Sequence, residues 1–417
     1  MVVESKALDD AKSSLNYQWI IFSLLSSSHL LMAMCYYSWG PLAPTLKGVL
    51  DISNSQFGYI ISLMYLAMVV VSAPSGFLVD HYGVKRMLFL SCFLVGSGMS
   101  LLAAKPSYTI LVATALLMGI GYGMINQITT KGFVYWFEAK KRGTVMGIKQ
   151  MGVTIGGSLI GIYIPFFSLY MGWRHAVLVL GLIVVAVSLI CLGLYKEKPT
   201  EDIDLDQAGD TANSKLQKTS LREVMMEPKL VLATILASLL AFCQACLTSF
   251  LVLYAKENFI INNIAAGSML TIAMVGGTFG RIILGMVSDR MLKGDRAMPL
   301  AIIGLIGVLS SFPLLFIESN TALWILYIIA AFLGISFMGW NSLAMVLVAE
   351  MVGSDKVGSV LGIVFMAAWG AMVAGPALFG RLVDMGGYAA AWLMVMILSG
   401  LACAGFLFMA RHYKPQS

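Results

Sequence analysis

Two basic side chains able to bind an anion stand inside segments that are otherwise apolar. Lys149 lies in MGIKQMGVTIGG (146–157), and Arg281 lies in MVGGTFGRIILGMVSD (274–289). A cation near the centre of a bilayer costs roughly 2.5–3.5 kcal/mol, so one that is retained faces a partner or a wet cavity. Across all the apolar segments of the chain, the acidic residues fall at or near segment ends: Asp51, Asp80, Glu138, Glu257, Asp289, Glu350 and Asp384. Two cations without an embedded carboxylate therefore predict an external anion, gripped bidentately by the guanidinium and attracted by the ammonium.

Lys149 also allows an interpretation other than anion binding. His29, a third basic residue in an apolar segment, allows two interpretations. The stem of Lys149 is long enough to carry its ammonium to the cytoplasmic interface, or the ammonium hydrogen-bonds a neighbouring helix. His29, in SSSHLLMAMCYYSWGP, is the only embedded group expected to titrate near neutrality and is a candidate proton carrier. The alternative is a structural, hydrogen-bonded histidine beside Ser26, Ser27 and Ser28.

Polar and aromatic residues near the middle of other segments complete the predicted site. Tyr122 and Asn126 lie one helical turn apart and share a face. The other predicted substrate-binding residues are Gln150, Asn341 and Trp369, and further candidates are Gln244, Thr248 and Phe337. Each asparagine also suits an interhelical hydrogen bond, and each aromatic residue also suits packing between helices.

Twelve apolar segments must position these residues. Of the 417 residues, 59% are hydrophobic and 12% are charged. An apolar run of about 18 or more residues is long enough to cross a bilayer as a helix, which satisfies its own backbone where water is absent. The predicted spans are 18–40, 56–79, 87–104, 108–130, 144–168, 174–195, 229–254, 264–288, 298–317, 321–347, 357–383 and 388–410. The predicted fold class is an all-α membrane protein.

Lys and Arg collect on one side of these spans. The opposite side keeps only five of them: Lys47, Lys105, Arg174, Lys256 and Arg381. Basic loops mark the cytoplasmic side, so both termini are predicted in the cytoplasm and the protein in the plasma (inner) membrane. The asymmetry accounts for the net charge of +6 without nucleic-acid binding. The polar start of the chain has no signal-peptide pattern, so we expect no cleaved leader.

A polar stretch divides the spans six and six. Residues 196–228 carry charges of both signs and are predicted to form a cytoplasmic linker. The linker separates an N-terminal six-helix bundle at 18–195 from a C-terminal six-helix bundle at 229–410. Residues 1–17 and 411–417 are predicted to be a cytoplasmic segment and a cytoplasmic tail.

The two halves are predicted repeats of one another. Gly119, Asn126, Gly143 and Gly147 recur 215 residues later as Gly334, Asn341, Gly358 and Gly362. Such a parallel repeat, with an even number of spans in each half, suits two bundles of like orientation. Lys149 aligns with Val364 and Arg281 with Ser72, so neither cation is required by the shared scaffold.

Two loops repeat a possible gating pattern. GFLVDHYGVKR (76–86) and GMVSDRMLKGDR (285–296) both place a glycine four residues before an aspartate that basic residues follow. A carboxylate at a helix end accepts bonds from a neighbouring helix N-terminus or pairs with Arg, and such bonds break when two bundles rock. The predicted gating residues are Asp80, Arg86, Asp289 and Arg290. Topology-setting charge and substrate contact are the alternatives.

Twelve spans arranged six plus six, the central linker and the two aspartate loops together resemble the major facilitator superfamily. The resemblance covers essentially the whole chain and implies two pseudo-symmetric bundles that move substrate by alternating access. His81 and Val84 depart from the pattern, because Arg is usual at both positions.

One branch of that superfamily is especially similar. Arg281, followed by a glycine and by Asp289, resembles the monocarboxylate and oxalate/formate porters, whose arginine in this span holds a substrate carboxylate. VYWFEAKKRGTVMGI (134–148) is similar to a loop of that branch and of cyanate-type anion permeases. The resemblance implies that Lys149 and Arg281 face each other across one cavity. Gly277 stands where proton-coupled porters of the branch often carry an acidic residue.

The sequence predicts a secondary transporter rather than an enzyme. It contains no P-loop, nucleophile constellation or metal-binding cluster, so ATP, cofactors and metals are not expected. The predicted partners are a small organic anion (a mono- or dicarboxylate), protons in the case of symport, and membrane lipid, and the protein is predicted to be monomeric. Anion exchange and proton symport both stay open, as do a cyanate-type inorganic anion porter and a non-transporting membrane sensor with a transporter fold.

Overall fold

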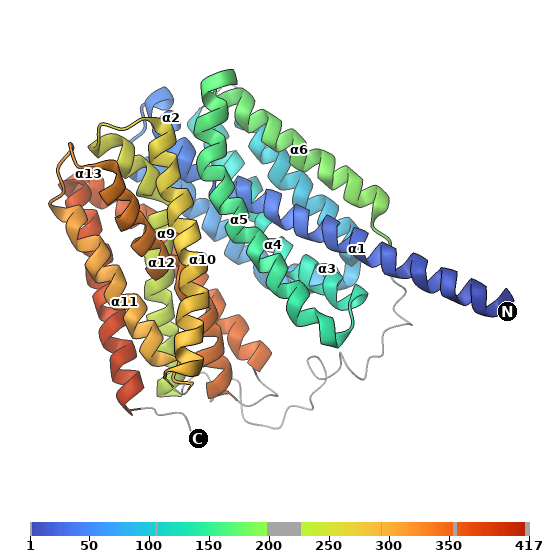
Figure 1. Ribbon diagram of the computed structural model, residues 1–417. Helices are drawn as coiled ribbons and strands as arrows, with labels where there is room; N and C mark the ends of the chain where they lie inside the picture. Colours follow the sequence, from blue (N-terminus) through green and yellow to red (C-terminus); the bar gives the residue numbers. More distant parts are fainter. Residues whose placement is uncertain (1, 105–106, 198–226, 293, 353–356, 413–417) are drawn as a thin grey trace.

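The structure, a computed structural model, describes residues 2–104, 107–197, 227–292, 294–352 and 357–412. These residues form helices and their connections, with no strand among them (Figure 1). The predicted all-helical fold class is therefore confirmed. Most of the predicted linker 196–228 and of the predicted tail 411–417 lies outside the described residues.

Ten stretches of the described chain are long and apolar enough to cross a membrane. The helices are α1 (Val2–Tyr37), α2 (Trp39–Leu50), α3 (Asn54–Leu101), α4 (Tyr108–Trp136), α5 (Ala139–Met171), α6 (Trp173–Leu194), α9 (Pro228–Asn258), α10 (Asn263–Arg290), α11 (Ala297–Ser311), the short 3-10 helix η3 (Phe312–Leu315), α12 (Leu323–Met351) and α13 (Val357–His412). The first candidate span joins the end of α1 to α2. α1 itself begins inside the segment that the sequence assigned to the cytoplasm.

Two of these helices each cover two of the twelve predicted spans. α3 contains the predicted span at 56–79 and most of the one at 87–104, and its backbone leaves the helical conformation at Gly83, with φ 81° and ψ 164°. α13 contains the last two predicted spans and breaks at Gly387, with φ 75° and ψ 178°. A positive φ is accessible to glycine without steric cost but strained for other residues. Both helices are thus interrupted where the sequence expects a turn, and the count of twelve stays a prediction.

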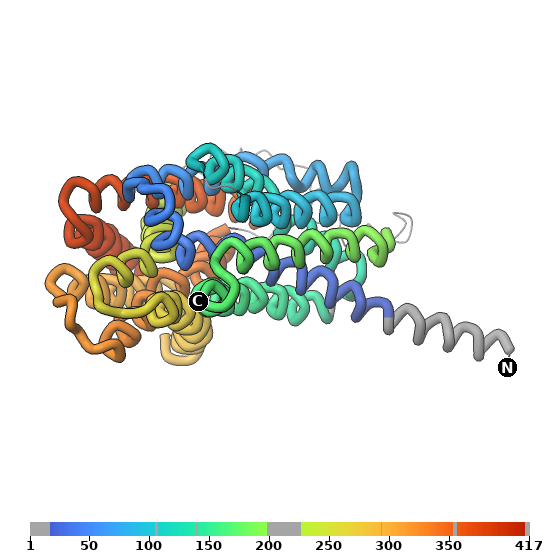
Figure 2. Tube along the Cα trace, turned by 90° about the horizontal axis from the view of Figure 1, so that it is seen from above, coloured from blue at the N-terminus to red at the C-terminus, as the bar shows by residue number. Residues whose placement is uncertain are grey.

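The two halves of the sequence gather on two sides of the molecule. Figure 1 shows α4, α5 and α6 on one side and α9 to α13 on the other, and the view in Figure 2 keeps this division. α3 packs against α13, α5 against α10, and α2 against α9 across the boundary. Glycines allow the close approach: a Cβ added at Gly58 of α3 would lie 2.2 Å from the carbonyl oxygen of Pro376, and one at Gly267 would lie 2.1 Å from that of Gly161.

The N-terminus of α3 is bonded directly to α13. A capping box starts the helix, because the Ser53 hydroxyl accepts from the Gln56 N–H at 3.1 Å and the Gln56 side chain accepts from the Ser53 N–H at 2.9 Å. The next two backbone N–H groups, of Asn54 and Ser55, donate to the Asp384 carboxylate at 3.1 and 2.7 Å. The side chains of Asn54 and Ser55 donate to it as well, at 2.9 and 2.5 Å. A carboxylate at this position also interacts favourably with the helix dipole.

A second set of bonds lies beside the first. Lys47 of α2 pairs with Glu257 of α9 at 2.7 Å and donates to the Asn54 side chain at 2.9 Å. The other oxygen of Glu257 accepts from the Tyr388 hydroxyl at 2.7 Å. Both sets join the two halves at the end of the molecule where α2 lies, which we call the α2 end (Figure 1). One ion pair and several hydrogen bonds to carboxylates therefore hold α2, α3, α9 and α13 together at the α2 end.

At the opposite end, the two predicted gating carboxylates pair within their own halves. Asp80 of α3 accepts from Lys131 of α4 at 2.5 Å. Asp289 of α10 pairs with Arg296, which also bonds Glu350 of α12 at 3.0 Å. The other two predicted gating residues, Arg86 and Arg290, belong to neither pair. The gating role of these four residues stays a prediction.

Asp384→Asn is expected to loosen the α2 end. The substitution keeps the shape but removes the charge that four donors share, which should weaken the closed arrangement by about 1–2 kcal/mol. Spin labels at the exposed Val49 of α2 and Ile260 after α9, with Cys403 replaced by Ser, report the separation by double electron–electron resonance. We expect a larger population of long distances. Asp51→Asn, at an exposed carboxylate of the same end, is the control, and an equal distance distribution in both variants would refute the assignment.

Candidate functional site

A cavity of about 910 Å³ lies between the two halves of the molecule. Side chains of α1, α3, α4 and α5 line it from one half, and side chains of α9, α10, α12 and α13 line it from the other. Its wall contains all seven predicted substrate-binding residues and the predicted proton carrier: Lys149, Gln150, Tyr122, Asn126, Arg281, Asn341, Trp369 and His29. The structure therefore brings these residues together around one space, while their roles stay predictions.

Lys149 is held by α4. Its side chain is 3% exposed, and its ammonium donates to the Asn126 side-chain oxygen at 2.7 Å, to the Thr130 hydroxyl at 3.0 Å and to the Asn126 backbone carbonyl at 3.3 Å. Three donors on one nitrogen thus meet three neutral acceptors. These are hydrogen bonds between α5 and α4, and because Lys149 also lines the cavity, its substrate-binding role stays a prediction. The positive charge has no carboxylate partner among the described ion pairs, so it stays uncompensated.

Arg281 is anchored at one nitrogen, and its side chain lines the cavity. Its Nε donates to the backbone carbonyl of Met338 on α12 at 2.8 Å. Over the described residues, its two Nη atoms have no hydrogen-bond partner, and the side chain lines the cavity. A guanidinium fixed through Nε presents a planar pair of N–H donors, which is the geometry that a carboxylate accepts bidentately.

Glycines of α10 explain how Met338 reaches Arg281. A Cβ added at Gly276 would lie 2.4 Å from the carbonyl oxygen of Ala331, and one at Gly277 would lie 2.3 Å from the Cβ of Met338. α12 therefore packs directly onto the backbone of α10 one turn before the arginine. The same contact leaves no room at Gly277 for a larger side chain unless α12 shifts.

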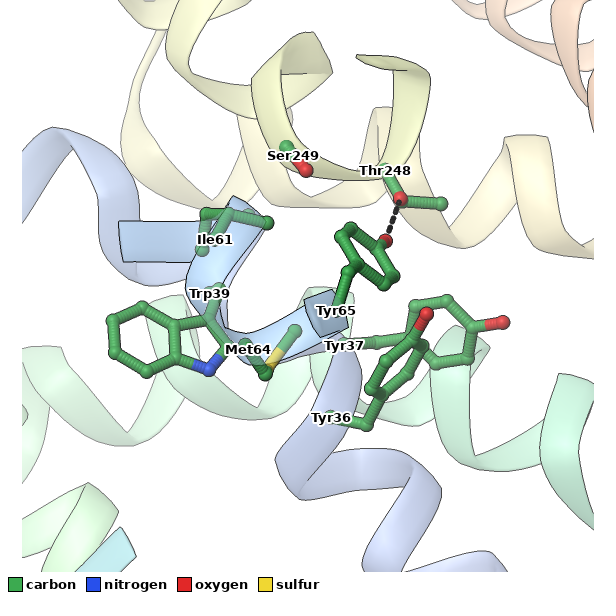
Figure 3. Close-up of a pocket in the computed structure, with 9 residues that line it drawn as sticks. Tyr36, Tyr37, Trp39, Ile61, Met64, Tyr65, Thr248 and Ser249 are labelled. Carbon is green, nitrogen blue, oxygen red and sulfur yellow. Dashed lines mark hydrogen bonds between the residues drawn. The ribbon is translucent and has the colours of Figure 1, made fainter. Parts of the chain in front are cut away.

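Tyrosines close the cavity toward the α2 end. Tyr36 of α1 stacks on Tyr122 of α4, with ring centroids 4.3 Å apart and planes at 8°. Tyr36 also meets Tyr37 and Tyr65 edge to face, and the Tyr65 hydroxyl lies 3.5 Å from the hydroxyl of Thr248 on α9 (Figure 3). Thr248, a sequence candidate, therefore belongs to this closing layer rather than to the wall of the larger cavity.

Sequence reasoning missed Tyr36 and Tyr37, which both line the cavity. One signal was available, because His29 and Tyr36 are seven residues apart and share a helix face. The further candidate Gln244 lines the cavity, whereas Phe337 is fully buried and does not.

His29 contacts residues of α4 rather than the neighbouring serines. Its Nδ1 lies 3.4 Å from the Thr129 hydroxyl, and its ring meets the Tyr122 ring edge to face at 6.4 Å. Ser28 donates instead to the backbone carbonyl of Leu24 at 2.7 Å. The imidazole is 3% exposed and lines the cavity on the same wall as Lys149. Both the structural role and the proton-carrying role remain compatible with this position.

Comparison with known proteins gives a consistent set of likenesses. The sequence matches the family model described as Major Facilitator Superfamily over residues 25–376. A hexuronate transporter of Bacillus subtilis (strain 168) is 24% identical over 388 residues, which are 89% of this chain and 89% of that protein. The membrane sensor protein UhpC of Salmonella typhimurium (strain LT2) is 23% identical over 290 residues, which are 66% of this chain and 64% of that protein.

A solved structure has a similar fold. The crystal structure of a bacterial homologue of the human lysosomal transporter Spinster, in an inward-facing and occupied conformation, has a TM-score of 0.78. The alignment covers 95% of this chain and 97% of that chain. At 14% sequence identity, the likeness concerns the fold alone.

Asn126→Asp is expected to stabilise the protein. The new carboxylate would lie where the Asn126 oxygen now accepts from Lys149 at 2.7 Å, and it would place an opposite charge beside an ammonium that has none among the described ion pairs. We expect a higher thermal unfolding temperature in detergent, corresponding to about 1–2 kcal/mol. Asn341→Asp, at the repeat counterpart in the same cavity, is the control. Equal unfolding temperatures for the two variants would contradict the described Lys149 contact.

Proposed function

Because the chain belongs to the Major Facilitator Superfamily, we propose that it is a secondary active transporter of a small organic anion, a mono- or dicarboxylate. Members of this family are transporters and not enzymes, as the sequence predicts for this chain. The match and the many apolar helices also identify a multi-pass membrane protein. The proposed location is the plasma (inner) membrane, with both termini in the cytoplasm and the protein monomeric.

The proposal rests on one observation: Arg281 is held in place at its Nε but has no carboxylate partner among the described residues. Its guanidinium is bonded to the Met338 carbonyl, its side chain lines the cavity, and no described carboxylate pairs with it. A cation that lines a cavity and has no carboxylate partner attracts an anion into that cavity. A carboxylate substrate satisfies both the charge and the paired donors.

Lys149 and the named relative add support. The Lys149 ammonium bonds neutral acceptors, so its charge contributes to the field in the cavity, where the low dielectric strengthens it. The hexuronate named for the Bacillus subtilis relative is itself an organic carboxylate. The resemblance to monocarboxylate and oxalate/formate porters goes further than the comparisons do and is part of the proposal.

The proposed mechanism is alternating access by two bundles of six helices. In it, Gly83 and Gly387 are the turns that divide α3 and α13 into two spans each, which makes twelve spans. The contacts of Asp384 and Lys47 close the α2 end and must break when the other end closes. Asp80 and Asp289 then exchange their present partners for groups of the opposite bundle.

Exchange of anions is the proposed form of coupling. The packing of α12 on Gly277 excludes the acidic side chain through which related porters couple to protons. Proton symport, with His29 as the carrier, is the alternative. A second candidate function, a membrane sensor with a transporter fold, is favoured by the likeness to UhpC.

Purified protein in liposomes separates these functions. Liposomes are preloaded with an anion and tested for counterflow of labelled lactate, oxalate, succinate and cyanate, with and without a pH gradient. Exchange predicts saturable counterflow of a carboxylate that the gradient does not change, and symport predicts dependence on the gradient. Saturable binding without flux would favour the sensor, and flux of cyanate alone would favour the inorganic anion porter.

Arg281→Lys is expected to weaken carboxylate uptake. Lysine keeps the charge but loses the paired donors and the bond to Met338, so KM should rise about 10–100-fold, the equivalent of about 1.5–3 kcal/mol. Arg142→Lys is the matched control, because Arg142 bonds the carbonyls of Phe137 and Val134 and does not line the cavity. If Arg281→Lys leaves KM unchanged for every anion tested, the anion site is wrong.

A further inference from the structure

The orientation of the Gln244 carboxamide is fixed by a buried tryptophan. The indole Nε1–H of Trp340 on α12 donates to the Gln244 side-chain oxygen on α9 at 3.0 Å, and Trp340 is 1% exposed. An indole nitrogen only donates, so the carboxamide oxygen must face it. The Gln244 NH₂ group, with two N–H donors, is then left for the cavity that Gln244 lines.

On the opposite wall of the cavity, a second carboxamide is also fixed by a side chain that only donates, here a lysine instead of a tryptophan. Lys149 is also a pure donor, and its bond to the Asn126 side-chain oxygen fixes that carboxamide in the same sense. The Asn126 NH₂ group therefore does not bond Lys149 of α5, and Asn126 lines the cavity as well. One carboxamide comes from α4 and the other from α9, so the two halves of the molecule contribute one each.

The two carboxamides add N–H donors to the cavity, whose other neutral side chains, among them Gln127, Gln150 and Asn341, also carry acceptor oxygens. Its described wall contains no Asp or Glu, and over the described residues neither carboxamide NH₂ group has an acceptor. With the Arg281 guanidinium, three side chains offer N–H groups to a ligand. A ligand that satisfies them needs a carboxylate for Arg281 and at least one more oxygen acceptor elsewhere in its structure.

We infer that Gln244 and Asn126 determine substrate specificity, by binding a second acceptor oxygen of an organic anion whose first carboxylate is bound by Arg281. The inference rests on the proposed function and names its substrate class: dicarboxylates and other anions with a second, non-cationic oxygen acceptor. A monocarboxylate with a methyl group at that position leaves the N–H groups desolvated and unpaired, which the site penalises. Trp340 and Lys149 act through the carboxamides and are positioning residues.

Succinate and butyrate test this inference, because they share one carboxylate and a similar length but differ in the second oxygen acceptor. Equilibrium binding of labelled succinate to the purified full-length protein, with competition by either acid, gives the ratio of their dissociation constants. In the wild type we expect succinate to bind at least about tenfold more tightly, the effect of one or two hydrogen bonds to a charged group.

Two variants separate specificity from stability. Trp340→Phe keeps the ring but frees the Gln244 carboxamide to rotate, and Gln244→Met removes its donors at similar length. Both should reduce the ratio to within about threefold by weakening succinate binding, while butyrate binding stays within about twofold, because butyrate makes neither bond. The matched control is Trp392→Phe. Trp392 is fully buried, and its indole N–H has no partner among the described residues, so the ratio should stay at its wild-type value.

The outcomes distinguish the inference from the proposed function. Absence of binding of either acid to the wild type would overturn both. Binding of both acids with a ratio near one would overturn the inference alone, and so would a wild-type ratio retained in Gln244→Met. Should Trp340→Phe fail to fold, Gln244→Met decides the result by itself.

Discussion

The structure depends on keeping two positive charges in an apolar interior without neutralising them. An isolated charge in such surroundings is unfavourable, and a carboxylate beside it would be the simplest remedy. The protein instead supplies neutral oxygens: a side-chain oxygen, a hydroxyl and a backbone carbonyl for Lys149, and a backbone carbonyl for Arg281. These acceptors lower the cost of burial but leave the net charge in place, so the cavity stays electropositive.

Close helix packing decides where those oxygens lie. The carbonyl that orients Arg281 belongs to α12. This helix can lie close to Arg281 because Gly276 and Gly277 of α10 have no side chains that would separate the two backbones. The packing that creates the site therefore also limits its chemistry, because a larger side chain at either glycine would separate the two helices.

Much of this arrangement could be predicted from the sequence, because the free energy of placing a charge in a membrane depends mainly on the single residue that carries it. Lys149 and Arg281 stand out in apolar segments, and both lie in the cavity wall with their six predicted companions. The bonds of Lys149 to α4 could not be predicted, since they depend on the rotation of one helix against another. The same holds for the link between Trp340 and Gln244, and for Tyr36 and Tyr37, since an aromatic residue in an apolar segment suits lipid, packing or a cavity equally. The continuous α3 and α13 differ from separate spans because single glycines, and not loops, interrupt them.

The uncompensated charge also has a kinetic consequence. A carrier that works in one direction must return unloaded, and during that step the cavity passes through a form sealed from both sides of the membrane. For this protein, sealing the unloaded cavity would enclose two cations that have no carboxylate partner among the described residues, at a cost that a bound carboxylate reduces. In the proposed exchange mechanism, the loaded protein therefore crosses the barrier faster than the empty one, and this difference ties the inward step to the outward step.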